Sequence, residues 1–239
     1  NRQMVEELLD VVLACHEDQA IRAVVLMGAG QAFCAGGDVR EFIEQTNTIA
    51  LHVKRLLMSL HSVITCICRM SKPVIASVGG VAAGAGMGLV MACDLAVAAE
   101  SARFTMAYTK IGATPDASSS YFLPRLVGLR RAMELTFTNR VLTAEEAKEW
   151  GLVNRVVPDA ELVTVVDAMA NELATGPTPA LGRAKRLLFM SDHASLETQM
   201  ENEAHLIALS SQTADFREGV QAFAEKRIPA FGVQERGEN

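Results

Sequence analysis

Two glycine-rich turns, each placed between a short apolar run and a helical segment, constrain the fold of this chain most strongly. The first turn reads Ala-Gly-Gly-Asp over residues 35–38 and follows an apolar run at residues 23–27. The second reads Gly-Ala-Gly-Met-Gly over residues 84–88 and follows the run Val74–Val78. Continuously apolar runs of this length that end at glycine are typical of strands buried on both faces. The order of strands, turns and helices therefore predicts an α/β protein.

Hydrophobic periodicity predicts the remaining elements. Helices are expected over residues 1–17, 49–68 and 130–137, and short strands over residues 95–98, 103–105 and 153–157. From Glu161 onward the pattern is helical throughout, and no linker interrupts the chain before about residue 160. We therefore expect two regions, a core of strand–helix units over residues 1–160 and a helical region over residues 161–239.

Composition and charge narrow the possible classes of function. The chain has 239 residues, half of them apolar, and a formal net charge of −6, which argues against general binding of nucleic acids. The run Val74–Val90 is too rich in glycine and alanine to predict a membrane span. Five cysteines at irregular spacing and five scattered histidines predict neither a disulfide framework nor a structural metal site. A reduced, cytoplasmic location is the simplest expectation.

The two turns suggest a site for an anionic oxygen. Peptide N–H groups at the start of a helix have no intrahelical partner, and two of them that converge on one point would form an oxyanion hole. Tight turns and close helix packing are the alternative explanation of the glycines. A dinucleotide-binding G-x-G-x-x-G motif is ruled out because position 89 is Leu89. A phosphate-binding G-x-x-x-x-G-K-[ST] loop and a G-x-S-x-G nucleophile elbow are both missing from the sequence.

Several motifs, in order along the chain, resemble the crotonase (enoyl-CoA hydratase/isomerase) superfamily. They are Phe33-Cys-Ala-Gly-Gly-Asp38, Lys72-Pro-Val-Ile-Ala76, Gly84-x-Gly86, Ala92-Cys-Asp-Leu95, Leu123-Pro-Arg-Leu-Val-Gly128, Ala144-x-x-Ala147 to Gly151-Leu-Val153, and Glu218-Gly-Val-x-Ala-Phe223. The resemblance covers nearly the whole chain. The first strand of the family has no counterpart, so we expect the core over residues 1–160 to lack it.

The resemblance implies a spiral of ββα units, a helical C-terminal trimerisation region, and assembly into homotrimers or hexamers. It implies acyl-CoA substrates, with coenzyme A as part of the substrate and no separate cofactor. The peptide N–H groups that bind the thioester oxygen match Ala35 and Ala85, and Gly84 belongs to the same substrate-binding turn.

Three further positions are assigned to substrate binding by the resemblance alone. Arg40 matches a lysine near the CoA nucleotide, although an exposed helix charge would explain it equally. Phe223 and Lys226 lie in a region that contacts the CoA of a neighbouring subunit in relatives; core packing and solvation are their respective alternatives.

Two departures from the family pattern argue against hydratase chemistry. The two glutamates that add water across the double bond match Gly88 and Tyr108. Neither residue offers a carboxylate, and a phenol with a pKa near ~10 is a poor base at neutral pH. We therefore expect Tyr108 to line the substrate pocket.

Asp116 is the candidate catalytic carboxylate. Its turn, Pro115-Asp116-Ala-Ser-Ser, resembles that of enoyl-CoA isomerases, in which one carboxylate moves the proton, and that of 4-chlorobenzoyl-CoA dehalogenase, in which the aspartate is a nucleophile. The histidine that activates water in the dehalogenase matches His61, and a tryptophan beside the nucleophile matches Tyr108. A helix cap for Asp116 and a core position for His61 are the structural alternatives.

Three functions remain open from the sequence. The favoured one is an enoyl-CoA isomerase with Asp116 as base. The second is an aroyl-CoA dehalogenase or hydrolase with Asp116 as nucleophile and His61 activating water. The third is a non-catalytic acyl-CoA-binding homologue, because both hydratase glutamates are replaced. The sequence does not identify the acyl group.

Overall fold

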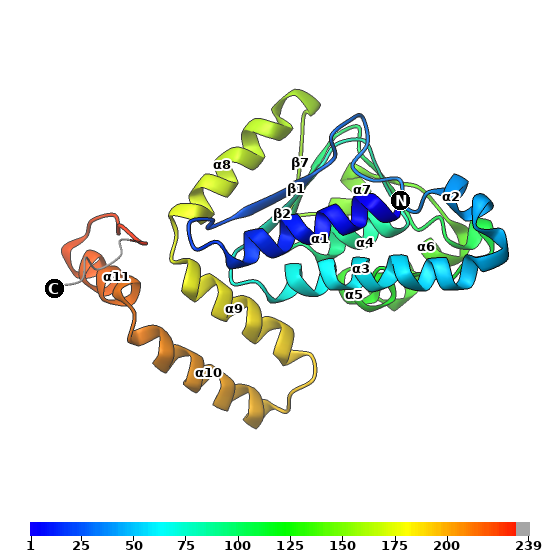
Figure 1. Cartoon of the computed structure of the whole chain (residues 1–239). Helices are drawn as coiled ribbons and strands as arrows, with labels where there is room; N and C mark the ends of the chain where they lie inside the picture. Colours follow the sequence, from blue (N-terminus) through cyan, green and yellow to red (C-terminus); the bar gives the residue numbers. More distant parts are fainter. Residues whose placement is uncertain (233–239) are drawn as a thin grey trace.

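The computed structural model describes residues 1–232 and has two small sheets surrounded by helices (Figure 1). The larger sheet is parallel and has the order β1-β2-β4-β7. Its strands are β1 (Val24–Met27), β2 (Val74–Val78), β4 (Leu95–Ala99) and β7 (Arg155–Val157). The smaller sheet has the order β3-β5-β6, with strands β3 (Val81–Ala83), β5 (Arg103–Thr105) and β6 (Leu142–Thr143).

From β2 onward the chain passes repeatedly between the two sheets, which gives it a spiral course. Strand β2 lies in the larger sheet and β3 in the smaller one, and β4 and β5 repeat this division. After β1, the single residue Cys34 bridges Ala82 and so extends the smaller sheet by one position. A helix follows each such pair, which confirms the expected α/β class and its repeated strand-strand-helix unit.

Both faces of the larger sheet are covered, as the continuously apolar strands predict. On one face, Ile75 and Val97 pack against Leu162, Val166 and Met169 of α8 (Leu162–Thr175). On the other face, the alternate strand residues pack into the main core with the helices α1 (Arg2–Glu17), α3 (Ile49–Arg69) and α4 (Ala85–Ala92). The strand period of two residues thus assigns each side chain to one of two cores.

Shorter helices complete the core. They are α2 (Val39–Glu44), α5 (Ser119–Val127), α6 (Leu129–Thr138), α7 (Ala144–Glu149) and the 3-10 turns Thr46–Thr48, Thr109–Ile111 and Asp159–Glu161. A capping box begins α7, with Thr143 as the N-cap and Glu146 as its partner. The stretch Thr46–Arg69 is long and apolar enough to cross a membrane. Its residues Leu60 and Ile67 are buried in the core, whereas Leu51 and Met58 are exposed.

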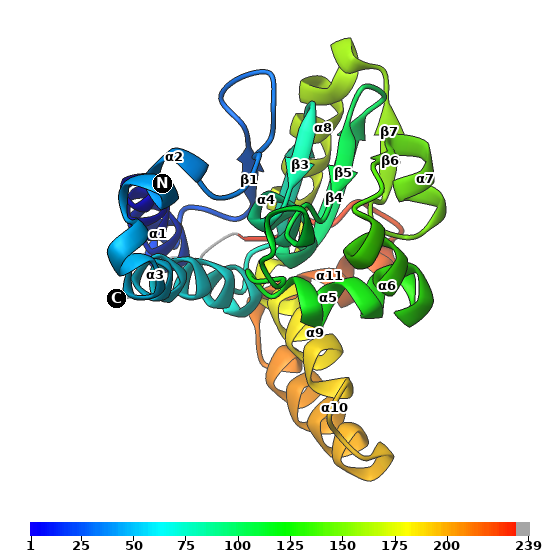
Figure 2. The ribbon, with the colours of Figure 1, turned by 90° about the vertical axis from the view of Figure 1, so that its right-hand side faces the viewer.

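The last three helices project away from the sheets (Figures 1 and 2). They are α9 (Thr178–Ser191), α10 (Leu196–Ser211) and α11 (Ala214–Glu225). Large apolar side chains are exposed on them, namely Leu188, Leu196, Met200, Ile207, Phe216, Val220 and Phe223. Since α8 packs on the sheet, the projecting part begins with α9, and the division of the chain after residue 160 stays a prediction.

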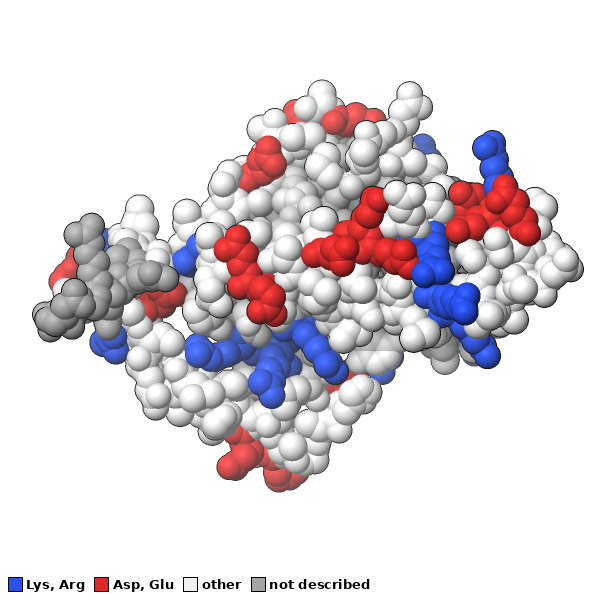
Figure 3. Space-filling view, viewed as in Figure 1, with Lys and Arg blue, Asp and Glu red and all other residues white. Residues whose placement is uncertain are grey.

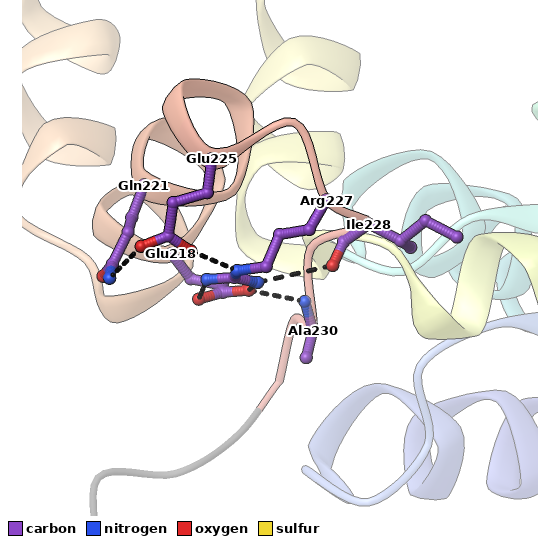
Figure 4. A network of polar contacts seen from close by, with 6 residues as sticks. All are labelled: Glu218, Gln221, Glu225, Arg227, Ile228 and Ala230. Carbon is purple, nitrogen blue, oxygen red and sulfur yellow. Dashed lines mark hydrogen bonds and ion pairs between the residues drawn. The ribbon is translucent and has the colours of Figure 1, made fainter.

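Polar contacts shape the end of α11 (Figure 4). Arg227 donates to both carboxylate oxygens of Glu218, at 2.6 and 2.9 Å, and to Glu225 at 2.6 Å. Glu218 also accepts the backbone N–H of Ala230 at 2.7 Å. These bonds hold the chain that leaves α11 against the helix itself.

Basic and acidic side chains are separated on the face seen in Figure 3. Lys and Arg gather along the border between the core and α9, and acidic side chains lie above them. Arg69, Arg183, Lys185 and Arg186 line one groove at this border. The local positive charge contrasts with the net charge of −6 of the whole chain.

One ion pair ties α9 to the core. The ammonium group of Lys185 donates to Oδ2 of Asp94 at 2.8 Å and to the carbonyl of Ile67 at 2.6 Å. The same oxygen of Asp94 accepts the N–H of Val74 at 2.8 Å. The two side chains are 10% and 19% exposed, so water does little to replace a lost partner.

We predict that Lys185→Met lowers the free energy of unfolding by about 3 kcal/mol, because it leaves the buried Asp94 carboxylate without its cation. Lys54→Met, at an exposed position of α3, is the matched control and should change stability by less than about 0.5 kcal/mol. Urea titration measures both. Adding Asp94→Asn to Lys185→Met should recover part of the loss. Equal stability of Lys185→Met and wild type would contradict this account.

Candidate active site

The two glycine turns lie side by side, as the sequence suggests. Cys34 donates its N–H to the carbonyl of Val81 at 3.1 Å and accepts the N–H of Ala83 at 2.9 Å. These bonds align the first turn with the chain that enters the second. A Cβ added at Gly36 would lie 3.7 Å from the backbone nitrogen of Ala85. The peptide groups of Ala35 and Ala85 are therefore close neighbours.

Both peptide N–H groups are available to a ligand. Ala85 is the first residue of α4, where the helix provides no acceptor for its N–H. Within residues 1–232, neither Ala35 nor Ala85 donates its N–H to a backbone carbonyl. Gly84 takes the positive φ of 53° that the turn requires, so Ala85 itself keeps an ordinary φ. Alanine at position 85 thus leaves the donor intact.

Asp116 is joined to Tyr108, eight residues earlier. The hydroxyl of Tyr108 donates to Oδ1 of Asp116 at 2.6 Å. A Cβ added at Gly84 would lie 3.8 Å from Cζ of the Tyr108 ring and 3.8 Å from Cα of Gly36. Tyr108 therefore links the Asp116 turn to both glycine turns.

The turn of Asp116 packs directly on α4. A Cβ added at Gly88 would lie 2.5 Å from the carbonyl oxygen of Ala117 and 3.1 Å from Oγ of Ser119. By the family resemblance, Gly88 matches the position of a catalytic glutamate of hydratases, and here no side chain fits without moving the turn. The space that a first glutamate would fill is thus occupied by the backbone that carries Asp116.

The backbone on both sides of this pair is strained. Ala107 has a φ of 56°, Ala117 of 47° and Ser118 of 57°. Residues other than glycine rarely adopt such values. Such residues cost about 1 kcal/mol or more each and persist where the surrounding packing determines them. Ala107 precedes Tyr108, and Ala117 and Ser118 follow Asp116, so backbone strain is concentrated at the candidate site.

The proposed cap role for Asp116 is wrong. The N-cap of α5 is Ser118 in a left-handed conformation, and its side chain makes no capping bond. Asp116 contributes its backbone carbonyl, which accepts the N–H of Ser119 at 2.9 Å. Its carboxylate is used by Tyr108 instead, because the left-handed residues turn it away from the first turn of the helix.

Burial raises the pKa of the half-buried Asp116 carboxyl above its usual value. The hydrogen bond from Tyr108 and the charge of His61 act in the opposite direction. His61 is exposed in this chain, so the alternative of a core position for this histidine is wrong. The buried stripe of α3 passes through Leu60 and Ile64, and His61 lies at its edge.

The remaining substrate-binding candidates are exposed and spread over the molecule. Arg40 lies on α2, which follows the first glycine turn. Phe223, at 88% exposure, and Lys226 lie at α11, far from α2 in this chain (Figure 1). Core packing therefore does not explain Phe223. Within the described residues, no group of three or more His, Cys, Asp or Glu side chains could hold a metal ion.

Sequence reasoning missed two features of the site. The contact of Gly88 with Ala117 depends on tertiary packing, and the hydrogen bond from Tyr108 depends on how the loop closes. The presence of Gly112 and Pro115 between the two residues of the pair indicated a loop, but gave no sign that its ends meet.

Comparisons with known proteins agree with this arrangement. The family model described as enoyl-CoA hydratase/isomerase matches residues 1–234. The chain belongs to the enoyl-CoA hydratase/isomerase (crotonase) family. A crystal structure of a putative enoyl-CoA hydratase/isomerase from Mycobacterium abscessus aligns with a TM-score of 0.92 at 34% identity, covering 97% of this chain and 90% of that one.

Curated relatives differ in their activities. A 1,2-epoxyphenylacetyl-CoA isomerase of Escherichia coli (strain K12) is 38% identical over 97% of this chain and 88% of its own length. A 4-chlorobenzoyl coenzyme A dehalogenase of an Arthrobacter species is also 38% identical, over 95% and 82%. A probable enoyl-CoA hydratase of Rhodobacter capsulatus is 41% identical over 88% and 80%. The chain is thus a crotonase-family enzyme, and the family implies an acyl-CoA substrate.

We predict that Gly88→Ala is destabilising by about 1–3 kcal/mol, because its Cβ would overlap the carbonyl of Ala117. Alanine otherwise favours a helix over glycine by about 1 kcal/mol, so the sign of the change tests the contact. Gly30→Ala is the matched control, since a Cβ there meets nothing within 4 Å. Chemical denaturation compares them, and a stabilised Gly88→Ala protein would show that α4 and the turn are not in contact.

Proposed function

We propose that this protein is an enoyl-CoA isomerase that shifts a double bond by proton transfer, with Asp116 as its base. The carboxylate removes a proton from C2 of a 3-enoyl-CoA, and the electrons pass into the thioester carbonyl. The peptide N–H groups of Ala35 and Ala85 bind the oxygen of the resulting dienolate. Asp116 then returns the proton at C4, and the double bond forms between C2 and C3.

The observation that carries the proposal is the half-buried carboxylate of Asp116, in a turn that packs on the same helix that presents the Ala85 N–H. A general base works best when its pKa is raised toward the operating pH, and burial acts in this direction at Asp116. Each donor of an oxyanion hole contributes about 3–4 kcal/mol to transition-state stabilisation in comparable sites. The relative in Escherichia coli, named an isomerase, supports the same choice.

The lack of the two hydratase glutamates argues against hydration as the reaction of this protein. Hydration needs a carboxylate to activate water, and position 88 is blocked by Ala117 while position 108 is a tyrosine. We expect hydration of crotonyl-CoA to be far slower than isomerisation of a 3-enoyl-CoA.

A second candidate is an aroyl-CoA dehalogenase or hydrolase. The electrostatic effect of His61 on Asp116 favours it, because a histidine on this side of the site could activate water against an aryl-aspartate adduct. The Arthrobacter relative is named a dehalogenase. Incubation with 4-chlorobenzoyl-CoA followed by rapid quenching tests it, and an adduct on Asp116 would favour this function. Binding of acyl-CoA without turnover of any thioester would instead indicate a non-catalytic homologue.

Self-association as a homotrimer or hexamer is part of the proposal. The exposed apolar side chains of α9, α10 and α11 support it, and Phe223 and Lys226 would then meet the CoA of a neighbouring subunit. Light scattering at micromolar concentration tests it, and a monomer would count against it.

We predict that Asp116→Asn lowers kcat for isomerisation by about 10²–10⁴-fold, as expected for loss of a general base. The amide keeps the size of the side chain and removes an ionised group from a half-buried place. The free energy of unfolding should therefore stay the same or rise, and binding of the acyl-CoA should persist. Wild-type turnover by a folded Asp116→Asn protein would contradict the proposal.

The pH dependence follows from the state of the same carboxylate. Asp116 acts as a base when ionised, so kcat/KM should fall as the pH drops through its pKa. Because burial raises this pKa, we expect the inflection above the ordinary value of about 3.9. Steady-state rates with a 3-enoyl-CoA measure it. A rate that stays constant down to the ordinary value would mean that Asp116 is not the base.

A further inference from the structure

The phenol of Tyr108 is a buried polar group that takes no part in the proton transfer proposed above. Tyr108 is 8% exposed, and its hydroxyl lies 2.6 Å from Oδ1 of Asp116. Burial and the hydrogen bond to the carboxylate raise the pKa of the phenol, so the hydroxyl keeps its proton and is the donor. The pair is therefore a hydrogen bond to a charged acceptor, which is stronger than one between neutral groups.

The position of this donor is determined by its own backbone. Tyr108 donates its N–H to the carbonyl of Met106 at 2.7 Å. Its carbonyl accepts the N–H groups of Ile111 and Ala113, both at 3.1 Å. The ring lies beside Gly84. Because these contacts do not involve Asp116, the hydroxyl is a fixed point against which the carboxylate is held.

We propose that Tyr108 is a positioning residue that holds Oδ1 of Asp116 through its hydroxyl and directs Oδ2 toward the substrate. This inference rests on the proposed function, in which Asp116 is the base. A carboxylate with one oxygen held cannot rotate freely, so the other oxygen faces one side of the substrate. A single base that serves both C2 and C4 needs this restriction, because misplacement by about 1 Å can cost 100-fold in rate.

The bond also affects the charge of the base. Donation from Tyr108 stabilises the ionised carboxylate and lowers the pKa of Asp116, while burial raises it. Tyr108 thus favours the ionised form of a half-buried base. A tyrosine that only filled space beside Gly84 would have neither effect.

The test is Tyr108→Phe, which keeps the ring and removes the donor. We expect kcat for a 3-enoyl-CoA to fall about 10- to 100-fold, with a smaller change in KM, because a hydrogen bond to a charged group is lost. The pKa of Asp116 rises without its donor, so the acid limb of the rate profile should move to higher pH. A base must be ionised to act, and this sets the direction of the shift.

Tyr121→Phe is the matched control, since the chain has two tyrosines. The hydroxyl of Tyr121 donates to Oδ2 of Asp192 at 3.1 Å, so this variant also loses a bond between tyrosine and aspartate. Asp192 lies just after α9, away from the two glycine turns. We expect its kcat and its acid limb to match those of wild type.

A second measurement needs no activity. In Tyr121→Phe protein, Tyr108 is the one remaining tyrosine, and near-ultraviolet absorbance at neutral pH reports the hydrogen bond that its hydroxyl donates. Adding Asp116→Asn replaces the charged acceptor by a neutral one, so the absorption band of Tyr108 should shift to shorter wavelength. An unchanged band would overturn the inference, even if Tyr108→Phe failed to fold.

The outcomes separate the two proposals. If Asp116→Asn abolishes turnover but Tyr108→Phe keeps the wild-type kcat and acid limb, the role of Tyr108 is wrong and the proposed function stands. If Asp116→Asn keeps turnover, the proposed function itself fails. A lowered kcat together with a shifted acid limb in Tyr108→Phe, and not in Tyr121→Phe, supports the inference.

Discussion

The contact between Gly88 and the carbonyl of Ala117 is the constraint on which the candidate site depends. It sets how closely the turn of Asp116 approaches α4, and α4 begins at Ala85, whose N–H is a proposed oxyanion donor. One short buried helix therefore positions the donor at its first residue and the base one turn further along. The left-handed conformations of Ala117 and Ser118 are the energetic cost of fitting the turn against the helix.

Asp94 and Asp116 are both partly shielded from water. The groups that bind each carboxylate determine whether its role is structural or chemical. Asp94 is held by the cation of Lys185 and the N–H of Val74, so its charge is neutralised and its carboxylate ties α9 to the sheet. Asp116 is held by the neutral phenol of Tyr108, which orients the carboxylate without neutralising it. Burial raises the pKa of both carboxyls, but only an oriented and unneutralised carboxylate is suited to accept a proton.

The sequence predicted β1, β2 and β4 of the larger sheet well, because each is a continuous apolar run such as Val74–Val78 with a clear end. It did not predict β3, which lies within the apolar, glycine-rich stretch before α4, or β6, which has only two residues. Ala35, Ala85 and Asp116 could be named as candidates through the resemblance to the crotonase family. The bond of Tyr108 and the packing of Gly88 could not, because both arise when distant turns meet in the folded chain.

Transfer of an isotopic label within the substrate tests the central claim most directly. A 3-enoyl-CoA deuterated at C2 is converted in ordinary water, and the product is analysed at low conversion for deuterium at C4. A single base that carries the proton from C2 to C4 predicts label at C4 with wild-type protein and no isomerised product with Asp116→Asn. Deuterium transfer that persists in Asp116→Asn would show that another group performs both steps, and the account would be wrong.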